Sequence, residues 1–147
     1  MNILVSHCFL GEPCRYDGAS RLDRQIIELH RAGHNLIPVC PEILGGLETP
    51  RSPAEIQPDG RVVTQDGKDV TAAYQAGAER AVALAREHGC TVAILKSRSP
   101  SCGCREIYDG TFTHTLKPGW GVAARLLDEA GLEVMDEEHL QASLYDV

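Results

Sequence analysis

Residues 91–104 read TVAILKSRSPSCGC. The first half is a short, nearly continuous apolar run, which is typical of a strand that is buried on both faces of a sheet. The second half contains serines, a proline, a glycine and two cysteines, so the strand ends in a loop that carries polar and reactive side chains. In an open parallel sheet, ligands bind beyond the carboxyl ends of the strands. The stretch therefore predicts both a buried parallel strand and a functional site at its end.

Other parts of the chain repeat this pattern. Short apolar runs at 2–6 (NILVS), 35–39 (NLIPV) and 132–135 (LEVM) predict three more strands. Apolar stripes with helical spacing predict helices over about 22–33, 70–89 and 122–131, each closed by a glycine. Strands that alternate with helices predict an α/β fold: a single Rossmann-like three-layer domain over 1–147, with a mostly parallel sheet and helices on both faces. We expect irregular chain over 50–69 and 97–118, and a short final helix over 137–145.

Composition limits the classes of function. The 147 residues carry a formal charge of −7 and a pI near 5.3, which argues against a broad basic face for nucleic acid, although a local basic patch stays possible. The N-terminal stretch is apolar for only a few residues, so it predicts neither a signal peptide nor a membrane span. We expect a cytoplasmic protein. Six cysteines in a reducing compartment are poor candidates for disulfides and show no paired CxxC spacing.

Three of the cysteines follow three different predicted strands. Cys8 comes after the first strand, Cys40 after the second, and Cys102 in the loop after the third. Carboxyl ends of parallel strands meet at one edge, so these thiols are candidates for a shared site. Three neighbouring thiolates need a cation, and their softness points to zinc, copper(I) or an iron–sulfur cluster. The alternative is that they are small apolar residues that pack well at strand ends.

Neighbouring residues suggest what such a site does. Glu42, Ser99 and Ser101 lie within two or three residues of Cys40 or Cys102, which favours a metal site with one position open for a substrate over a closed structural one. The remaining thiols have weaker claims. Cys14 is either a fourth ligand or a spare thiol, Cys90 is expected in the core, and Cys104 is a bystander or a redox partner; His7 and His114 are either acid–base groups or structural residues.

Several sequence blocks resemble the thiouracil desulfidase family. They include VSHCFLGEPCRYDG at 5–18, PVCPEILGGLETPRSPAEI at 38–56 and AILKSRSPSCG at 93–103, and the resemblance runs from Ile3 to about Glu138. It implies an enzyme that removes sulfur from thiolated uracil without net redox change. It also implies a [4Fe-4S] cluster held by Cys8, Cys40 and Cys102, with Glu42 and Ser101 as catalytic residues and Ser99 as the rival serine.

On this hypothesis the substrate sulfur binds the open iron of the cluster, Glu42 activates water, and a serine binds the base or moves a proton. Thiouracil and water then give uracil and hydrogen sulfide. The expected partner is a small thiolated pyrimidine, hydrogen-bonded by Lys96, Ser97 or Tyr16, and thiolated RNA is the less favoured substrate. The alternative function is a zinc-binding module, or a thiol-redox module that uses Cys102 with Cys104 or Cys8 with Cys14.

Overall fold

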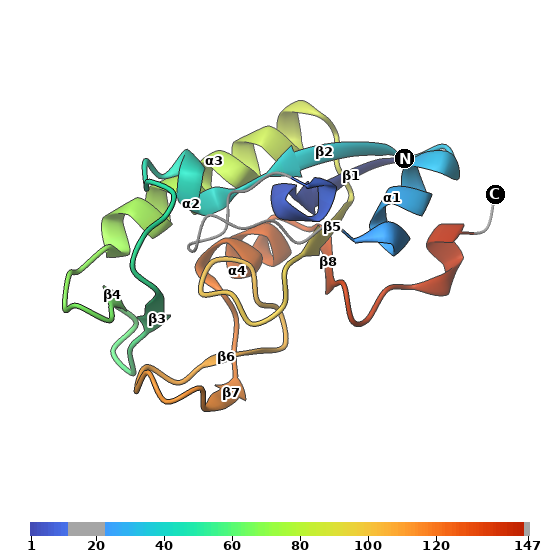
Figure 1. Ribbon diagram of the computed structural model, residues 1–147. Helices are drawn as coiled ribbons and strands as arrows, with labels where there is room; N and C mark the ends of the chain where they lie inside the picture. Colours follow the sequence, from blue (N-terminus) through green and yellow to red (C-terminus); the bar gives the residue numbers. More distant parts are fainter. Residues whose placement is uncertain (12–22, 146–147) are drawn as a thin grey trace.

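A four-stranded parallel sheet forms the centre of the protein. The structure is a computed structural model that describes residues 1–11 and 23–145. The sheet has the strand order β2-β1-β5-β8, built from β2 (Asn35–Val39), β1 (Asn2–Ser6), β5 (Val92–Leu95) and β8 (Glu133–Asp136). Its two central strands are almost wholly buried, as their apolar sequences predict. The expected α/β fold with a parallel sheet is confirmed (Figure 1).

Helices cover both faces of this sheet. Leu4 and Leu95 point to one face, where they pack in a core with residues of α3 (Thr71–Glu87) and α4 (Val122–Glu129). Ile3 and Ile94 point to the other face and pack with α1 (Arg24–Arg31). Neighbouring residues of a strand face opposite sides, so one apolar run supplies both cores. None of the helices in the described part of the chain has the length and apolar character needed to cross a bilayer.

The connections diverge at the middle of the sheet. After β1 the chain passes through a short 3-10 helix, η1 (His7–Leu10), and α1 to the edge strand β2. After β5 it passes through α4 to the opposite edge strand β8. Loops at the carboxyl ends of β1 and β5 therefore leave in opposite directions, which is where open α/β sheets bind ligands. Beyond β2, the chain turns into the one-turn helix α2 (Pro41–Leu44).

Two hairpins replace the irregular chain expected over 50–69 and 97–118, so that part of the prediction is wrong. The first pairs β3 (Ala54–Ile56) with β4 (Val62–Thr64), and the second pairs β6 (Glu106–Tyr108) with β7 (Leu116–Pro118). Strands of three residues are too short to show a period of two in sequence. The hairpins also support each other, because the Glu55 carboxylate accepts hydrogen bonds from the backbone N–H groups of Gly110 and Phe112.

The final helix expected over 137–145 is also only partly formed. The chain after β8 makes turns, and just Ala142–Tyr145 form a 3-10 helix, η2. The Asp136 carboxylate accepts hydrogen bonds from the Glu138 N–H and from His139 Nδ1, and such side-chain bonds compete with helix formation. The Leu144 carbonyl is in turn bonded to His34 Nε2 at 2.6 Å, which fixes this end of the chain to the body of the protein.

Close backbone contact positions α2 against α3. A Cβ atom added at Gly77 would lie 1.8 Å from the Pro41 carbonyl oxygen, and one added at Gly45 would lie 2.0 Å from the Ala73 carbonyl oxygen. Both glycines are therefore needed for the two helices to approach this closely. An isolated one-turn helix has no stability of its own, so the position of α2 depends on this contact.

We expect Gly77→Ala to destabilise the protein by about 1–3 kcal/mol, the usual cost of overpacking a tight contact. In an ordinary helix the same substitution would stabilise by up to about 1 kcal/mol, so the sign of the change is diagnostic. Chemical denaturation measures it, with Ala72→Ser on the exposed side of the same helix as the control. A Gly77→Ala variant as stable as the parent protein would contradict the close contact.

Candidate functional site

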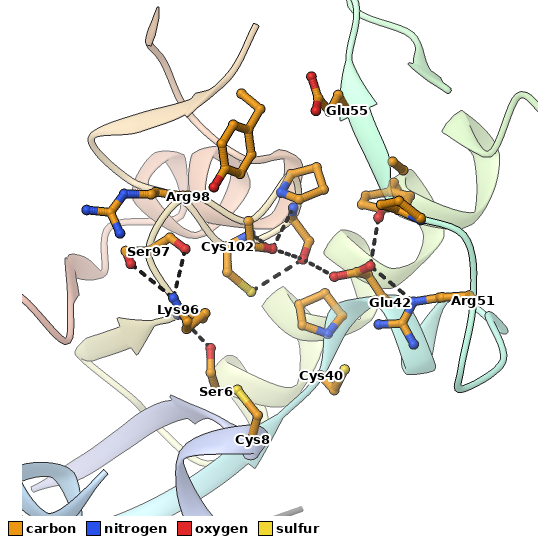
Figure 2. A pocket seen from close by; sticks show the side chains of 18 of the residues that line it. Ser6, Cys8, Cys40, Glu42, Arg51, Glu55, Lys96, Ser97, Arg98 and Cys102 are labelled. Carbon is orange, nitrogen blue, oxygen red and sulfur yellow. Dashed lines mark hydrogen bonds and ion pairs between the residues drawn. The ribbon is translucent and has the colours of Figure 1, made fainter. Parts of the chain in front are cut away.

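A cavity of about 280 Å³ opens at the carboxyl ends of β1, β2 and β5. Residues from the β3 strand and from the β6–β7 hairpin form its outer wall. Figure 2 shows the side chains that converge on it. Every site residue predicted from the sequence lies on the lining of this one cavity: Cys8, Cys40, Glu42, Ser99, Ser101 and Cys102.

Three different segments bring the cysteines to the cavity. Cys8 lies on η1, Cys40 is the residue that caps the N-terminus of α2, and Cys102 lies in the loop after β5. Cys8 and Cys102 are buried, and Cys40 is partly exposed. In residues 1–11 and 23–145, no three His, Cys, Asp or Glu side chains are placed to hold a single metal ion. Three cysteine thiols on the lining of one cavity are a set of donors suited to a soft metal group such as an iron–sulfur cluster.

The environment of Cys102 favours a cationic partner. Burial raises the pKa of its thiol to about 12, and the nearby Glu42 carboxylate and Cys40 act in the same direction. The hydroxyls of Ser101 and Ser6 oppose this effect by hydrogen bonding to the sulfur; the Ser101 Oγ to Cys102 Sγ distance is 3.4 Å. The thiolate form of Cys102 therefore requires positive charge in the cavity, which a bound metal group supplies.

The Glu42 carboxylate is held by donors from three segments. Its Oε1 atom accepts a hydrogen bond from the Tyr74 hydroxyl at 2.7 Å and pairs with Arg51 Nε at 3.2 Å. Its Oε2 atom accepts from the Ser101 hydroxyl at 3.0 Å. Burial, together with the adjacent Glu42 charge, raises the pKa of Tyr74 far above its usual value, so its hydroxyl remains a donor. One carboxylate oxygen is thus anchored by two donors, and the other accepts from Ser101.

The two candidate serines have different surroundings. Ser101 is 1% exposed, and its hydroxyl is within hydrogen-bond distance of Glu42, of the Cys102 sulfur and of the Ser99 hydroxyl. Ser99 Oγ also accepts hydrogen bonds from the backbone N–H groups of Ser101 and Cys102, both at 3.2 Å. Ser99 therefore shapes the loop, while Ser101 connects the carboxylate with the thiol.

The structure also places the other residues that the sequence analysis considered. Lys96, Ser97, His7 and His114 line it, whereas Cys90 and Cys104 pack in the core cluster between the sheet and the α3 and α4 helices. Burial raises the pKa of the Cys104 thiol to about 11, with Asp136 as a further cause. Cys14 and Tyr16 lie outside the described residues.

Sequence reasoning missed several residues at the site. Tyr74 belongs to the apolar stripe of the helix predicted over about 70–89, and a helical stripe gives no sign of its hydrogen bond to Glu42. No sequence pattern pointed to Ser6 or Glu137 as residues of the site. Ser6 Oγ accepts a hydrogen bond from the Lys96 N–H at 2.9 Å, and Glu137 lies 3.1 Å from Lys96 Nζ. These contacts join segments that are about 40 to 90 residues apart in sequence.

Comparisons with known proteins agree with this architecture. The sequence pattern of the 2-thiouracil desulfurase family matches residues 3–139. The chain is 42% identical over 150 residues to the uncharacterized protein YbbK of Bacillus subtilis strain 168, covering 94% of this chain and 97% of YbbK. A solved structure of the [4Fe-4S]-dependent thiouracil desulfidase TudS is 43% identical, with a TM-score of 0.88, covering 95% of this chain and 92% of that one. Since the family match covers nearly the whole sequence, the chain belongs to the 2-thiouracil desulfurase family.

Proposed function

We propose that this protein is a [4Fe-4S]-dependent desulfidase that converts thiouracil and water to uracil and hydrogen sulfide. The observation that carries the proposal is the cavity itself, where thiols from three strand ends lie beside a linked carboxylate and serine. Family membership and the 43% identity to TudS support the same reaction class. The arrangement combines a site for a soft metal group with groups that can move a proton.

Cys8, Cys40 and Cys102 would hold the cluster. With three protein ligands, a bound cluster supplies a Lewis acid with an open position for a soft sulfur atom. The protein supplies the shape and the electrostatics of the cavity around it. The Ser101 hydroxyl already contacts the Cys102 sulfur, and hydrogen bonds of this kind tune iron–sulfur clusters.

Glu42 and Ser101 would handle the protons of the reaction. Replacing the ring C=S bond by C=O transfers the oxygen of one water to carbon and its two protons to sulfur. Glu42 Oε2 takes a proton from the attacking water, while Arg51 and Tyr74 fix the other oxygen of that carboxylate. Ser101 contacts both Oε2 and the thiol side of the cavity, so its hydroxyl can pass a proton toward the departing sulfur.

The cavity favours a small substrate. Its volume of about 280 Å³ lies just below the usual range for small-molecule sites, about 300–1,000 Å³, which favours a small ligand such as a free pyrimidine base. Two arginines on its lining, which could have attracted phosphates, are paired with carboxylates: Arg51 with Glu42, and Arg98 with Glu106 and Glu138. We therefore infer that the substrate is a small thiolated pyrimidine and that thiolated RNA is a poor substrate.

The alternative functions receive less support. A structural zinc site usually has four ligands and a local CxxC pair, and the sequence shows no paired CxxC spacing. A redox pair of Cys102 and Cys104 needs the two thiols to act together, whereas Cys102 lines the cavity and Cys104 is not among the lining residues and bonds to Asp136 instead. Protein purified without oxygen separates the possibilities, because a [4Fe-4S] protein is brown and a zinc or dithiol protein is colourless.

Replacing Cys8, Cys40 or Cys102 by serine should remove the cluster, since each would bind a separate iron. Iron and acid-labile sulfide are measured after anaerobic reconstitution. Cys90→Ser is the matched control, because Cys90 packs in the core away from the cavity, and it should keep the cluster. Full cluster content in any of the three site variants would contradict the assigned ligands.

Glu42→Gln and Ser101→Ala should each lower kcat by about 10²- to 10⁴-fold, the usual contribution of a positioned proton-transfer group. The visible spectrum of the cluster should remain, because neither side chain is an assigned ligand. Ser99→Ala should cost less, since Ser99 contacts mainly backbone. If Ser99→Ala proves the more damaging of the two serine variants, the proton path assigned to Ser101 is wrong.

Free 2-thiouracil should release sulfide faster than an equal concentration of thiouridine within transfer RNA. The small cavity and the paired arginines are the physical reason. Hydrosulfide is measured over time with protein of known cluster content. Faster release from the RNA would show that a surface outside the cavity binds nucleic acid despite the net charge of −7.

A further inference from the structure

A second ion pair lies at the cavity, on the side of Cys102 away from Glu42. Figure 2 shows Lys96 and Ser97 on one side of Cys102, and Glu42 and Arg51 on the other. Lys96 directly follows β5, and its Nζ atom lies 3.1 Å from Glu137 Oε2. The reaction proposed above gives this pair no role.

Glu137 is a buried carboxylate that accepts hydrogen bonds from Ser97 and forms an ion pair with Lys96. Its side chain is only 5% exposed. Oε1 accepts from the Ser97 N–H at 2.8 Å, and Oε2 accepts from the Ser97 hydroxyl at 3.2 Å in addition to pairing with Lys96. Burying a carboxylate is costly unless it is paired and hydrogen-bonded. These contacts fix both the position and the orientation of Lys96.

The two members of this pair differ in their relation to the cavity. Lys96 and Ser97 are part of the cavity lining, whereas Glu137 is not among the lining residues. The pair of Glu42 and Arg51 differs, because both of its members line the cavity. The basic residue of this pair therefore lines the cavity, and its acidic partner does not.

The ammonium group can also offer a direct contact. Its bonds to Ser97 are at 3.1 Å to the hydroxyl and 3.3 Å to the carbonyl oxygen. The longer of the two is the contact that an anion in the cavity would replace. A bond from a charged donor to an anion is stronger than one to a neutral carbonyl, so the exchange is favourable.

We propose that Lys96 is an anion-binding residue of this cavity and that Glu137 positions it for the sulfur-centred anion that the reaction releases. The ligand class is a small soft anion, hydrosulfide in the first place. The identity of the anion, hydrosulfide, rests on the proposed function. The negative charge of the ligand is inferred from the ion pair, because its basic residue lines the cavity. Lys96 then stabilises negative charge as it collects on the departing sulfur.

Binding of sodium hydrosulfide to the anaerobically reconstituted protein tests the proposal. Isothermal titration calorimetry gives the affinity without requiring turnover, and uracil, the neutral product, serves as the control ligand. Lys96→Met should weaken hydrosulfide binding by about tenfold or more, the size expected for one charge-assisted contact, and should weaken uracil binding by much less, because uracil is neutral. Lys68→Met removes an exposed lysine outside the cavity and is the matched control for the loss of one charge.

Glu137→Gln makes the test specific for electrostatics. The amide oxygen of glutamine keeps an acceptor for Lys96 and the Ser97 hydroxyl, while the acceptor for the Ser97 N–H is lost. The charge that opposes Lys96 is also removed, so hydrosulfide binding should become tighter. A purely structural role for the pair predicts weaker binding in both variants. The double variant Lys96→Met/Glu137→Gln leaves no unpaired buried charge, and it should bind hydrosulfide as weakly as Lys96→Met even if that single variant folds poorly.

The outcomes separate this inference from the proposed function. Unchanged hydrosulfide binding in the double variant, or an equal loss of uracil binding, would overturn the role of Lys96 even if the protein releases sulfide from 2-thiouracil. Conversely, binding that depends on Lys96 in a protein that never releases sulfide from any thiolated pyrimidine would leave the anion site intact and overturn the desulfidase assignment.

Discussion

The hydrogen bonding of one carboxylate holds the site together. Glu42 lies on a helix of a single turn, yet it is bonded to a tyrosine from α3, an arginine from the next loop and a serine from the loop after β5. A four-residue helix cannot fix a side chain by itself. The glycine contact between α2 and α3 brings Glu42 to Tyr74, and the sheet brings it to Ser101. Three separate segments must therefore be in place before the carboxylate has its final geometry.

Charge explains much of what surrounds this carboxylate. Buried thiols and carboxylates in a small cavity are unfavourable unless cations accompany them. Arg51 and Lys96 supply two such cations from within the chain, on opposite sides of Cys102. A metal cluster bound by the three cysteines would supply more. This balance gives a physical reason why an acidic protein with a net charge of −7 keeps Arg51 and Lys96 at the cavity.

The sheet was predictable from sequence because its strands are short apolar runs, and because their parallel arrangement follows from alternation with helices. The candidate residues Cys8, Cys40, Glu42 and Cys102 were within reach for a related reason, since each follows a strand that could be identified. Tyr74, Ser6 and Glu137 were not within reach. They meet the site through contacts that link distant parts of the sequence, and no local pattern records them. The hairpins were missed because three-residue strands form only through pairing with their partners.

The two hairpins have a consequence for how such a protein can change over evolution. Each is too small to be stable alone, and they meet through one carboxylate, that of Glu55, bonded to the backbone at Gly110 and Phe112. They form the outer wall of the cavity, while the thiols, Glu42 and Ser101 stand on segments that follow the central sheet. Changes in the length or sequence of either hairpin can thus alter which molecules fit the cavity while the reacting groups stay in place. The residues that determine which molecules fit and the residues that react lie in separate parts of the chain. Substrate selectivity can therefore change without loss of the reaction.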